Sequence, residues 1–152
     1  MRNYIEETVN NLIKKYNTRN PFEILKELDI AVEFNSCLES LKGFFTVINK
    51  RKSVVINGNL SREEQKTVAA HELGHSCLHD HFAESREFRE FMIYDMESKP
   101  EYEANLFASI LLVSDEDIKE ATDLGYCGSQ MAAYLNIDEK LLDIRLGAKV
   151  QL

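Results

Sequence analysis

Two histidines and a glutamate lie close together in the segment His71-Glu72-Leu73-Gly74-His75. On a helix, residues four positions apart lie one above the other, about 6 Å apart. Two imidazoles placed in this way can bind the same metal ion. Glu72 projects about 100° around the helix from His71, so its carboxylate would lie beside the ion without binding it. The spacing therefore predicts a metal site with an adjacent carboxylate.

This set of residues is typical of metal-dependent hydrolysis of a peptide bond. A divalent ion polarises a carbonyl group and lowers the pKa of a water molecule toward neutrality. Glu72 could accept a proton from that water and pass it to the leaving amine. The alternative is an ordinary helix that carries two histidines by chance, because the pentapeptide also recurs in unrelated sequences. Gly74 favours the metal site: glycine costs a helix about 1 kcal/mol relative to alanine, and close approach of another element would explain it.

A catalytic zinc site usually has three protein ligands, and two candidates for the third follow on the same segment. His81 lies six residues after His75, but a glycine would have to break the helix for it to swing back, and Leu78 stands at that position. His79 lies one turn beyond His75 on the same face, too far along a straight helix for the same ion. Its expected roles are the C-terminal cap of the helix or the wall of a cleft, with substrate contact as a weaker alternative.

Glu101, the favoured third ligand, lies on a separate predicted helix, PEYEANLFASILL (100–112). Asn105 lies one turn further on the same face, where it could hydrogen-bond the far nitrogen of a ligand histidine and fix its orientation. Glu103 lies about 200° around the helix from Glu101, so both carboxylates cannot face the ion. The alternative role for Glu101 is that of a favourable first-turn carboxylate near a helix N-terminus. No single residue stands out as the oxyanion stabiliser; the candidates are Arg89, Tyr94, Tyr102 and His79.

The elements that would position these residues form a small α+β domain, a single domain of residues 1–152. Ser61 and Glu64 form a capping-box pattern at the start of the predicted metal-binding helix, which runs from about residue 61 to 78. Runs of β-branched and aromatic residues predict three strands in an antiparallel sheet packed on that helix: 30–34, 43–48 and 53–57. Apolar periodicity predicts further helices: 4–16, 20–28, 100–112, 114–125 and two short ones within 129–147. Whether 82–98 is a lid or a loop is left open.

The composition limits the partners and the compartment. The formal net charge is −8, which disfavours binding to nucleic acid, and the only basic cluster, NKRKS (49–53), is interpreted as a hairpin turn. No apolar run is long enough to span a membrane, and the N-terminus lacks the apolar core of a secretion signal. The three cysteines are widely spaced and include no CxxC pair, which fits a reducing compartment. We therefore expect a cytoplasmic protein that binds neither membranes nor nucleic acid.

The two motifs together resemble the ImmA/IrrE-type zinc metallopeptidases. The resemblance is carried by INGNLSREEQKTVAAHELGHSCLH (56–79) and EYEANLFASILLVSDEDI (101–118), because the family pairs HELGH with a later ExxANxFAxxLL. The proline that often follows the two leucines is absent here. The resemblance covers about residues 40–145 and implies a zincin-like metallopeptidase fold. It also implies one catalytic zinc ion with His71, His75 and Glu101 as ligands, and Glu72 as the general base.

The resemblance further implies a cytoplasmic protease of narrow specificity. Many members of the family are encoded on phages or other mobile elements and inactivate the helix-turn-helix repressor that silences the element by cleaving it. The expected partner is therefore such a repressor, and an exposed edge strand beside the site could pair with an extended substrate. Other divalent ions than zinc would also suit two histidines and a carboxylate.

Two other functions compete with a protease. One is a non-proteolytic regulator whose metal site is structural or vestigial, although a structural zinc site would normally have a fourth protein ligand. The other is DNA binding by SQMAAYLNIDEKLLDIRL (129–146), which has a faint helix-turn-helix rhythm. That segment offers mainly Lys140 and Arg145 for contacts with DNA, so a pair of core-forming helices is favoured.

Overall fold

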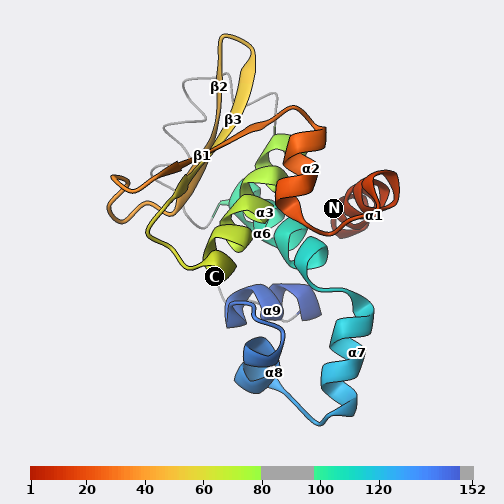
Figure 1. Ribbon diagram of the computed structural model, residues 1–152. Coiled ribbons are helices and arrows are strands. Elements are labelled where there is room, and N and C mark those ends of the chain that lie inside the picture. Colours follow the sequence, from red (N-terminus) through yellow and green to blue (C-terminus); the bar gives the residue numbers. More distant parts are fainter. Residues whose placement is uncertain (80–97, 148–152) are drawn as a thin grey trace.

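The computed structural model describes residues 1–79 and 98–147. Within these two ranges the chain forms seven helices and one three-stranded sheet (Figure 1), which confirms the predicted α+β class. The helices are α1 (Arg2–Tyr16), α2 (Pro21–Glu27), α3 (Arg62–Leu78), α6 (Lys99–Leu112), α7 (Asp115–Asp123), α8 (Gly128–Tyr134) and α9 (Glu139–Leu146). The strands are β1 (Ala31–Asn35), β2 (Gly43–Ile48) and β3 (Arg51–Asn57). The candidates His81, Arg89 and Tyr94, and the segment 82–98 apart from Ser98, lie outside the described residues.

The sheet is mixed, so the predicted all-antiparallel sheet is wrong. β2 and β3 form the expected antiparallel hairpin, with Phe45 opposite Val54. β1 runs parallel to β3, with Val32 opposite Val54, and the strand order is β1-β3-β2. The reason lies in β3, whose residues Val54, Val55 and Ile56 are all buried. Such a continuous apolar run is typical of a central strand, so β3 lies between β1 and β2. Because β1 and β2 run in opposite directions, β3 is antiparallel to β2 and parallel to β1.

The basic cluster at 49–53 lies at the turn of the β2–β3 hairpin, as predicted. Asn49 and Lys50 are the two turn residues, with φ angles of 51° and 64°. Two consecutive positive φ angles are characteristic of the type I′ turn, whose twist matches that of the flanking strands. The geometry of the hairpin therefore accounts for the position of this basic cluster at a turn.

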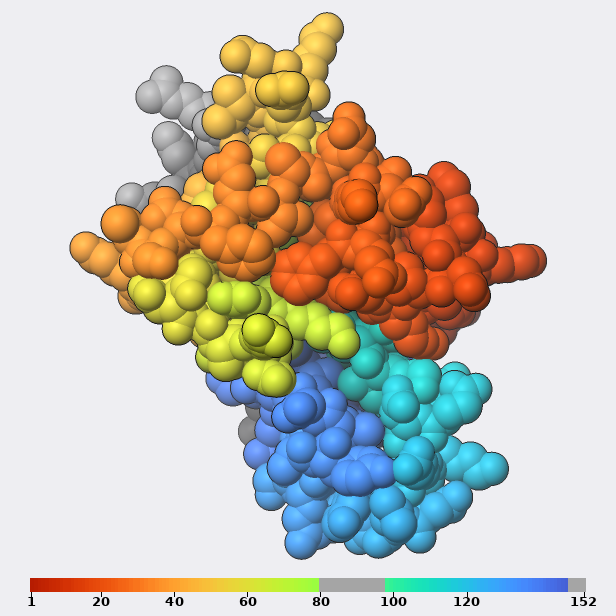
Figure 2. Space-filling view, in the orientation of Figure 1, coloured from red at the N-terminus to blue at the C-terminus, as the bar shows by residue number. Residues whose placement is uncertain are grey.

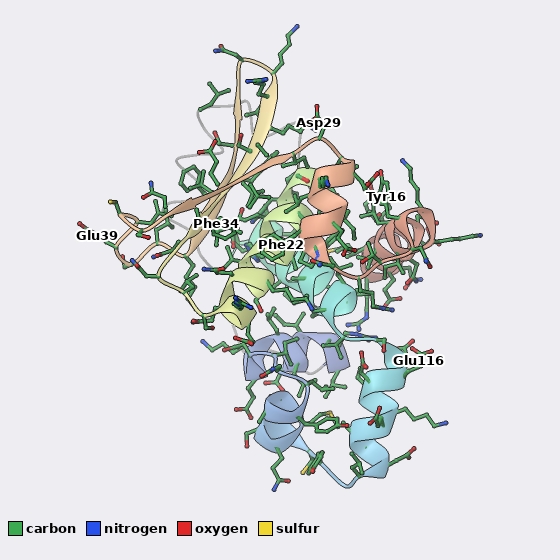
Figure 3. The ribbon with its side chains drawn as sticks, in the orientation of Figure 1. Tyr16, Phe22, Asp29, Phe34, Glu39 and Glu116 are labelled. Atoms are coloured by element: carbon green, nitrogen blue, oxygen red, sulfur yellow. The ribbon has the colours of Figure 1, made fainter. Side chains whose placement is uncertain are left out.

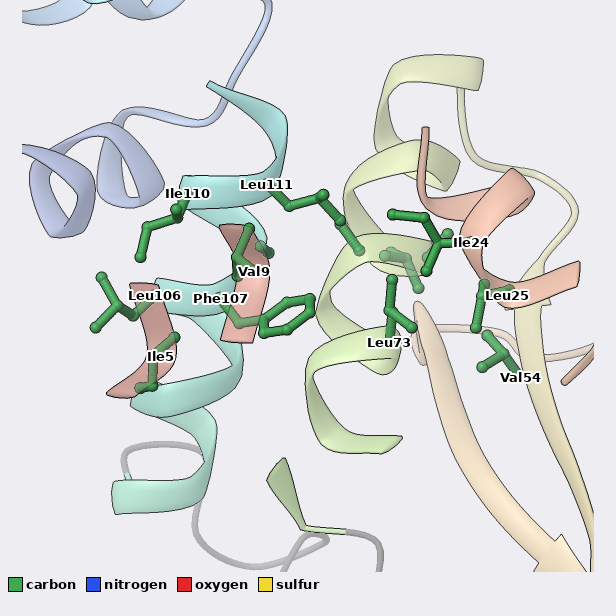
Figure 4. Packing of buried hydrophobic residues seen from close by; sticks show 14 of the residues in the cluster. Ile5, Val9, Ile24, Leu25, Val54, Leu73, Leu106, Phe107, Ile110 and Leu111 are labelled. Atoms are coloured by element: carbon green, nitrogen blue, oxygen red, sulfur yellow. The ribbon is translucent and has the colours of Figure 1, made fainter. Parts of the chain in front are cut away.

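Helix α3 is the central element of the main hydrophobic core. The predicted capping box is present: the Ser61 side chain accepts a hydrogen bond from the Glu64 N–H, and the Glu64 carboxylate accepts one from the Ser61 N–H. Figure 4 shows Leu73 of α3 between Phe107 of α6 on one side and Leu25 of α2 on the other. Helix α3 therefore packs between α6 and the layer formed by α2 and the sheet.

Of the N-terminal elements, α2 covers the side of α3 that faces away from α6, whereas α1 packs on α6. Phe22 of α2 and Phe34 of β1 form a tilted ring pair with centroids 6.3 Å apart (Figure 3). Asp29, in the turn between these two elements, has a positive φ of 56°, which lets the chain reverse over a short distance. Ile5 and Val9 of α1 pack against α6 (Figure 4). Helix α2 therefore packs on α3, and α1 packs on its partner helix α6.

Helices α7, α8 and α9 form a second, smaller hydrophobic cluster at the end of the molecule opposite the hairpin (Figures 1 and 2). Its buried residues include Met131 of α8 and Leu142 of α9. Arg145 of α9 donates a hydrogen bond to the carbonyl oxygen of Val113 at 3.1 Å and pairs with the carboxylate of Asp115. This guanidinium therefore joins α9 to the end of α6 and the start of α7. Among the described residues, no helix is both long enough and apolar enough to cross a membrane.

Candidate metal centre

Three side chains from two helices converge on one point. His71 and His75 lie one turn apart on α3, and their Nε2 atoms are 3.0 Å apart. Glu101 lies in the first turn of α6, and its carboxylate oxygens are 3.2 Å from Nε2 of His71 and 3.1 Å from Nε2 of His75. One ligand atom from each residue lies within 4.8 Å of the other two. The helix pair thus brings together the three residues that the sequence singled out as ligands.

Gly74 lets α3 and α6 approach closely enough for this convergence. A Cβ atom added at Gly74 would lie 3.2 Å from both the Cα and the carbonyl oxygen of Ala104, and 3.2 Å from the Cβ of Phe107. Two of these neighbours are backbone atoms of α6, which cannot rotate away. The absence of a side chain at this position therefore sets the distance between the helix that carries the histidines and the helix that carries Glu101.

The chemistry of the cluster fits a divalent metal ion. Two imidazole nitrogens and one carboxylate oxygen are a donor set that zinc accepts readily. His75 and Glu101 are both buried, with 1% and 8% of their surface exposed. Oε1 of Glu101 lies near Nε2 of His75 yet forms no well-aligned hydrogen bond with any described residue. A buried carboxylate oxygen without a hydrogen bond is costly, and a bound cation would remove that cost.

Asn105 holds His71 in the orientation that a ligand needs. Its Oδ1 lies 2.8 Å from Nδ1 of His71, the contact expected from the spacing of Glu101 and Asn105 on α6. Because an amide oxygen can only accept, Nδ1 carries the proton. Nε2 of His71 is therefore the nitrogen that faces the cluster and can bind an ion.

Glu72 lies beside the cluster and is held by the sheet. Its carboxylate accepts a hydrogen bond from the backbone N–H of Phe45 in β2. The N–H of Asn57 donates to the carbonyl of Lys42 across the hairpin, and the ladder alternates, so the N–H of Phe45 points away from β3 toward α3. Oε2 of Glu72 is buried and has no hydrogen-bond partner among the described residues. One carboxylate oxygen is therefore available for chemistry.

Burial and the neighbouring charges separate the pKa values of the acidic groups. Burial raises the pKa of Glu72 to about 7, with a smaller opposing effect from the charge of His71. Burial would also raise the pKa of Glu101, but its close contacts with the imidazoles of His71 and His75 outweigh it and lower that pKa to about 2. At neutral pH Glu101 is therefore ionised, whereas Glu72 is close to its midpoint and can both accept and release a proton.

The pKa values of the two histidines move in opposite directions. Burial, followed by the charge of His71, lowers the pKa of His75 to about 4, so its imidazole is neutral at physiological pH. Burial would lower the pKa of His71 as well, but the carboxylates of Glu101 and Glu72 outweigh it and raise that pKa. A neutral imidazole is the form that binds a metal, so His75 is already in that form.

The model of the IrrE N-terminal-like domain, a peptidase family, matches residues 25–147. The chain belongs to this family. The matched range contains both helices of the candidate metal centre and the whole sheet. The resemblance drawn from the paired motifs is therefore confirmed.

Two relatives resemble this family member over most of its length. The chain is 31% identical to "Uncharacterized immunity region protein 2" of Bacillus phage phi105, over 93% of this chain and 88% of the phage protein. It is 30% identical to the metallopeptidase ImmA of Bacillus subtilis strain 168, over 93% of this chain and 83% of that protein. One relative is thus a phage protein and the other a named metallopeptidase.

His79 has a more specific environment in this IrrE-type domain than the sequence indicated. It is the C-cap of α3, and only 4% of it is exposed. Its Nδ1 lies 3.1 Å from Nδ1 of His75, and its Nε2 lies 2.9 Å from Oε2 of Glu103. Glu103 thus contacts His79 and not the cluster, a contact that sequence reasoning missed. The spacing of His79 four residues after His75 was a signal for the contact between these two histidines, but not for the contact with Glu103. Tyr102, a candidate oxyanion stabiliser, packs against the main hydrophobic core.

Proposed function

We propose that the protein is a zinc-dependent endopeptidase. In this proposal His71, His75 and Glu101 hold one zinc ion, and Glu72 is the general base. The observation that carries it is the convergence of three ligand atoms from α3 and α6 next to a buried carboxylate whose pKa is raised to about 7. Membership of a metallopeptidase family supports the same function.

Each residue of the centre has a distinct task in this mechanism. When bound, the zinc ion supplies a Lewis acid that polarises the scissile carbonyl and lowers the pKa of a water molecule. Glu72 takes the proton from the attacking water and then delivers it to the leaving amine. The N–H of Phe45 holds one carboxylate oxygen of Glu72, which keeps the other aimed at the reacting atoms. Asn105 keeps Nε2 of His71 facing the cluster.

The edge of β2 that faces away from β3 is the proposed docking site for the substrate chain. It lies beside the cluster, because the N–H of Phe45 on this edge reaches Glu72. In this proposal an extended peptide lies along this edge near Phe45 and presents its carbonyl group next to Glu72. The substrate would then be recognised mainly through its backbone, with side chains of alternate residues supplying specificity.

We infer that the substrate is a helix-turn-helix repressor of a phage or other mobile element. The family resemblance implies this substrate, and the similarity to an immunity-region protein of a phage supports it. A cytoplasmic location belongs to the same proposal, because such repressors act on cytoplasmic DNA. The chain is proposed to act as one metallopeptidase domain over residues 1–152.

The competing functions have less support. Within the described residues the cluster contains three candidate ligands, whereas a structural zinc site normally has four. In the C-terminal helices, Arg145 is engaged with Val113 and Asp115 and so is not directed at DNA. Neither a structural metal site nor a DNA-reading helix is therefore favoured.

Cleavage of a purified helix-turn-helix repressor of a phage or mobile element tests the proposal. The zinc-loaded wild type is expected to cut the purified repressor at a single site, and a chelator should abolish the cutting. Glu72→Gln should bind as much zinc as the wild type but cut at least a hundredfold more slowly, an effect in the range of a lost general base. If zinc-loaded Glu72→Gln cuts the repressor as fast as the wild type, the mechanism is wrong. A shift of duplex DNA at physiological salt by the protein alone would favour a binding module.

A further inference from the structure

Three histidines form a continuous row along one face of α3. The ring centroids of His71 and His75 are 4.7 Å apart, and those of His75 and His79 are 5.3 Å apart. The row does not end at the candidate metal ligands. It continues through His79 and crosses to α6 at Glu103, with contacts of 3.1 Å and 2.9 Å between hydrogen-bonding atoms. His75, His79 and Glu103 thus form a connected chain, all of it largely shielded from solvent.

The two ends of this chain fix a consistent direction for its hydrogen bonds. A carboxylate oxygen accepts, so Nε2 of His79 donates to Glu103. When Nε2 of His75 holds an ion, the proton of that ring is on Nδ1. Nδ1 of His75 then donates to Nδ1 of His79, 3.1 Å away. The donors thus run from His75 through His79 to Glu103.

The arrangement at His75 parallels the one at His71, but with one additional residue. At His71, the acceptor Asn105 contacts Nδ1 directly. At His75, the acceptor Glu103 acts through His79. Both acceptors lie on α6, the helix that also carries Glu101. A single helix therefore supplies the third candidate ligand and the two groups that determine which nitrogen of each histidine faces the ion.

Glu103 is well placed for this task. Its side chain is only 16% exposed, and its Oε1 lies 3.7 Å from the ammonium group of Lys99. Oε1 of Glu103 thus faces Lys99, while Oε2 faces His79. Lys99 itself is mostly exposed, with 74% of its side chain accessible, so it adds charge without rigid packing.

We propose that Glu103 is a positioning residue of the metal centre, which acts through His79 to hold His75 with Nε2 facing the ion. Groups that orient metal ligands from behind typically change metal affinity about 10- to 100-fold when they are removed. The inference rests on the proposed zinc site, but it does not require that the protein cleaves peptides. It differs from a plain structural clamp between α3 and α6, because a clamp would not select one nitrogen of His75.

Zinc affinity provides the first test. Competition with a chromophoric chelator should show Glu103→Ala binding zinc about 10- to 100-fold more weakly than the wild type. Glu103→Gln should recover most of the affinity, because its amide oxygen can still accept from His79. Lys99→Ala is the matched control, since it removes only the exposed partner of Glu103, and its zinc affinity should stay within twofold of the wild type. Wild-type affinity in Glu103→Ala would overturn the proposal.

The proton positions provide a second test that needs no metal. Nitrogen-15 NMR of the metal-free wild type should show His75 protonated at Nδ1 and His79 protonated at Nε2. Glu103→Gln, the variant most certain to fold, should keep this pattern, and Glu103→Ala should show a mixture of both forms at His75. If the pattern at His75 is the same in all three proteins, or if Glu103→Ala loses stability but not zinc affinity, Glu103 is only a clamp. A wild type that binds no zinc would instead refute the proposed function, while the NMR comparison would still report on Glu103.

Discussion

Gly74→Ala is the substitution whose outcome depends most directly on the packing of α3 against α6. In an ordinary helix this change is favourable by about 1 kcal/mol, because alanine is the better helix former. Here the new Cβ would lie 3.2 Å from the Cα and carbonyl oxygen of Ala104 and from the Cβ of Phe107. Contacts this short require the two helices to move apart by a few tenths of an ångström.

The expected magnitude is the balance of these two effects. Overpacking a well-packed core by one carbon typically costs about 1–3 kcal/mol. Set against a propensity gain of about 1 kcal/mol, the net change is a loss of about 1 kcal/mol in the free energy of unfolding. The separation of α3 and α6 also moves Glu101 away from His71 and His75, so zinc affinity should fall as well.

Urea denaturation of the metal-free protein, in the presence of a chelator, measures the first effect, and chelator competition measures the second. Ala133→Gly on the exposed side of α8 calibrates helix propensity in the same protein and should cost about 1 kcal/mol. If Gly74→Ala stabilises the protein by about the same amount and binds zinc normally, the spacing of α3 and α6 does not depend on Gly74.

Two further substitutions test the environment of the site. Burial raises the pKa of Glu72 from 4.5 to about 7, so the stability from its protonated form is fully present below pH 4.5 and is lost as the pH rises through 7. Without metal, the free energy of unfolding of Glu72→Gln should therefore equal that of the wild type at pH 4 and exceed it by about 3 kcal/mol at pH 8. Urea denaturation at both pH values measures this difference, and equal free energies at pH 8 would contradict the raised pKa. Asn105→Ala should weaken zinc binding about 10- to 100-fold and Asn105→Asp much less, because only the latter keeps an acceptor for Nδ1 of His71; equal losses in a chelator competition would show that the hydrogen bond is unimportant.

Local patterns in the sequence were sufficient for most of the secondary structure. The capping box at Ser61 and Glu64 correctly predicted the start of α3, and apolar periodicity predicted both α6 and the helix pair α8 and α9. These features depend on residues within one or two helical turns of each other. The direction of β1 was missed because it depends on β3 lying between β1 and β2, and that order is a property of the whole sheet.

The contacts of the candidate site can also be divided into those that local spacing predicts and those that depend on how the helices pack. Facing ligands on α3 and α6 could be anticipated because residues four apart share a helical face, which relates His71 to His75 and Glu101 to Asn105. The contact between His79 and Glu103 depends on where the end of α3 lies against α6. No spacing within a single helix contains that information.

The hydrogen bond to Glu72 could not be anticipated for another reason. Its donor is the backbone N–H of Phe45, and a backbone amide leaves no trace in the residue type. Only the position of β2 at one end of the strand order among the described residues, with the amide directed away from β3, makes the contact possible.

X-ray absorption at the zinc edge of the loaded wild-type protein tests the central claim most directly, because it identifies the atoms bound to the ion. If His71, His75 and Glu101 hold the metal, the spectrum should show one zinc environment with two imidazole ligands and only oxygen besides. A third imidazole in the spectrum would mean that another histidine binds the ion in place of Glu101, and a sulfur ligand would mean that a cysteine binds it. Either spectrum would contradict the metal centre described here.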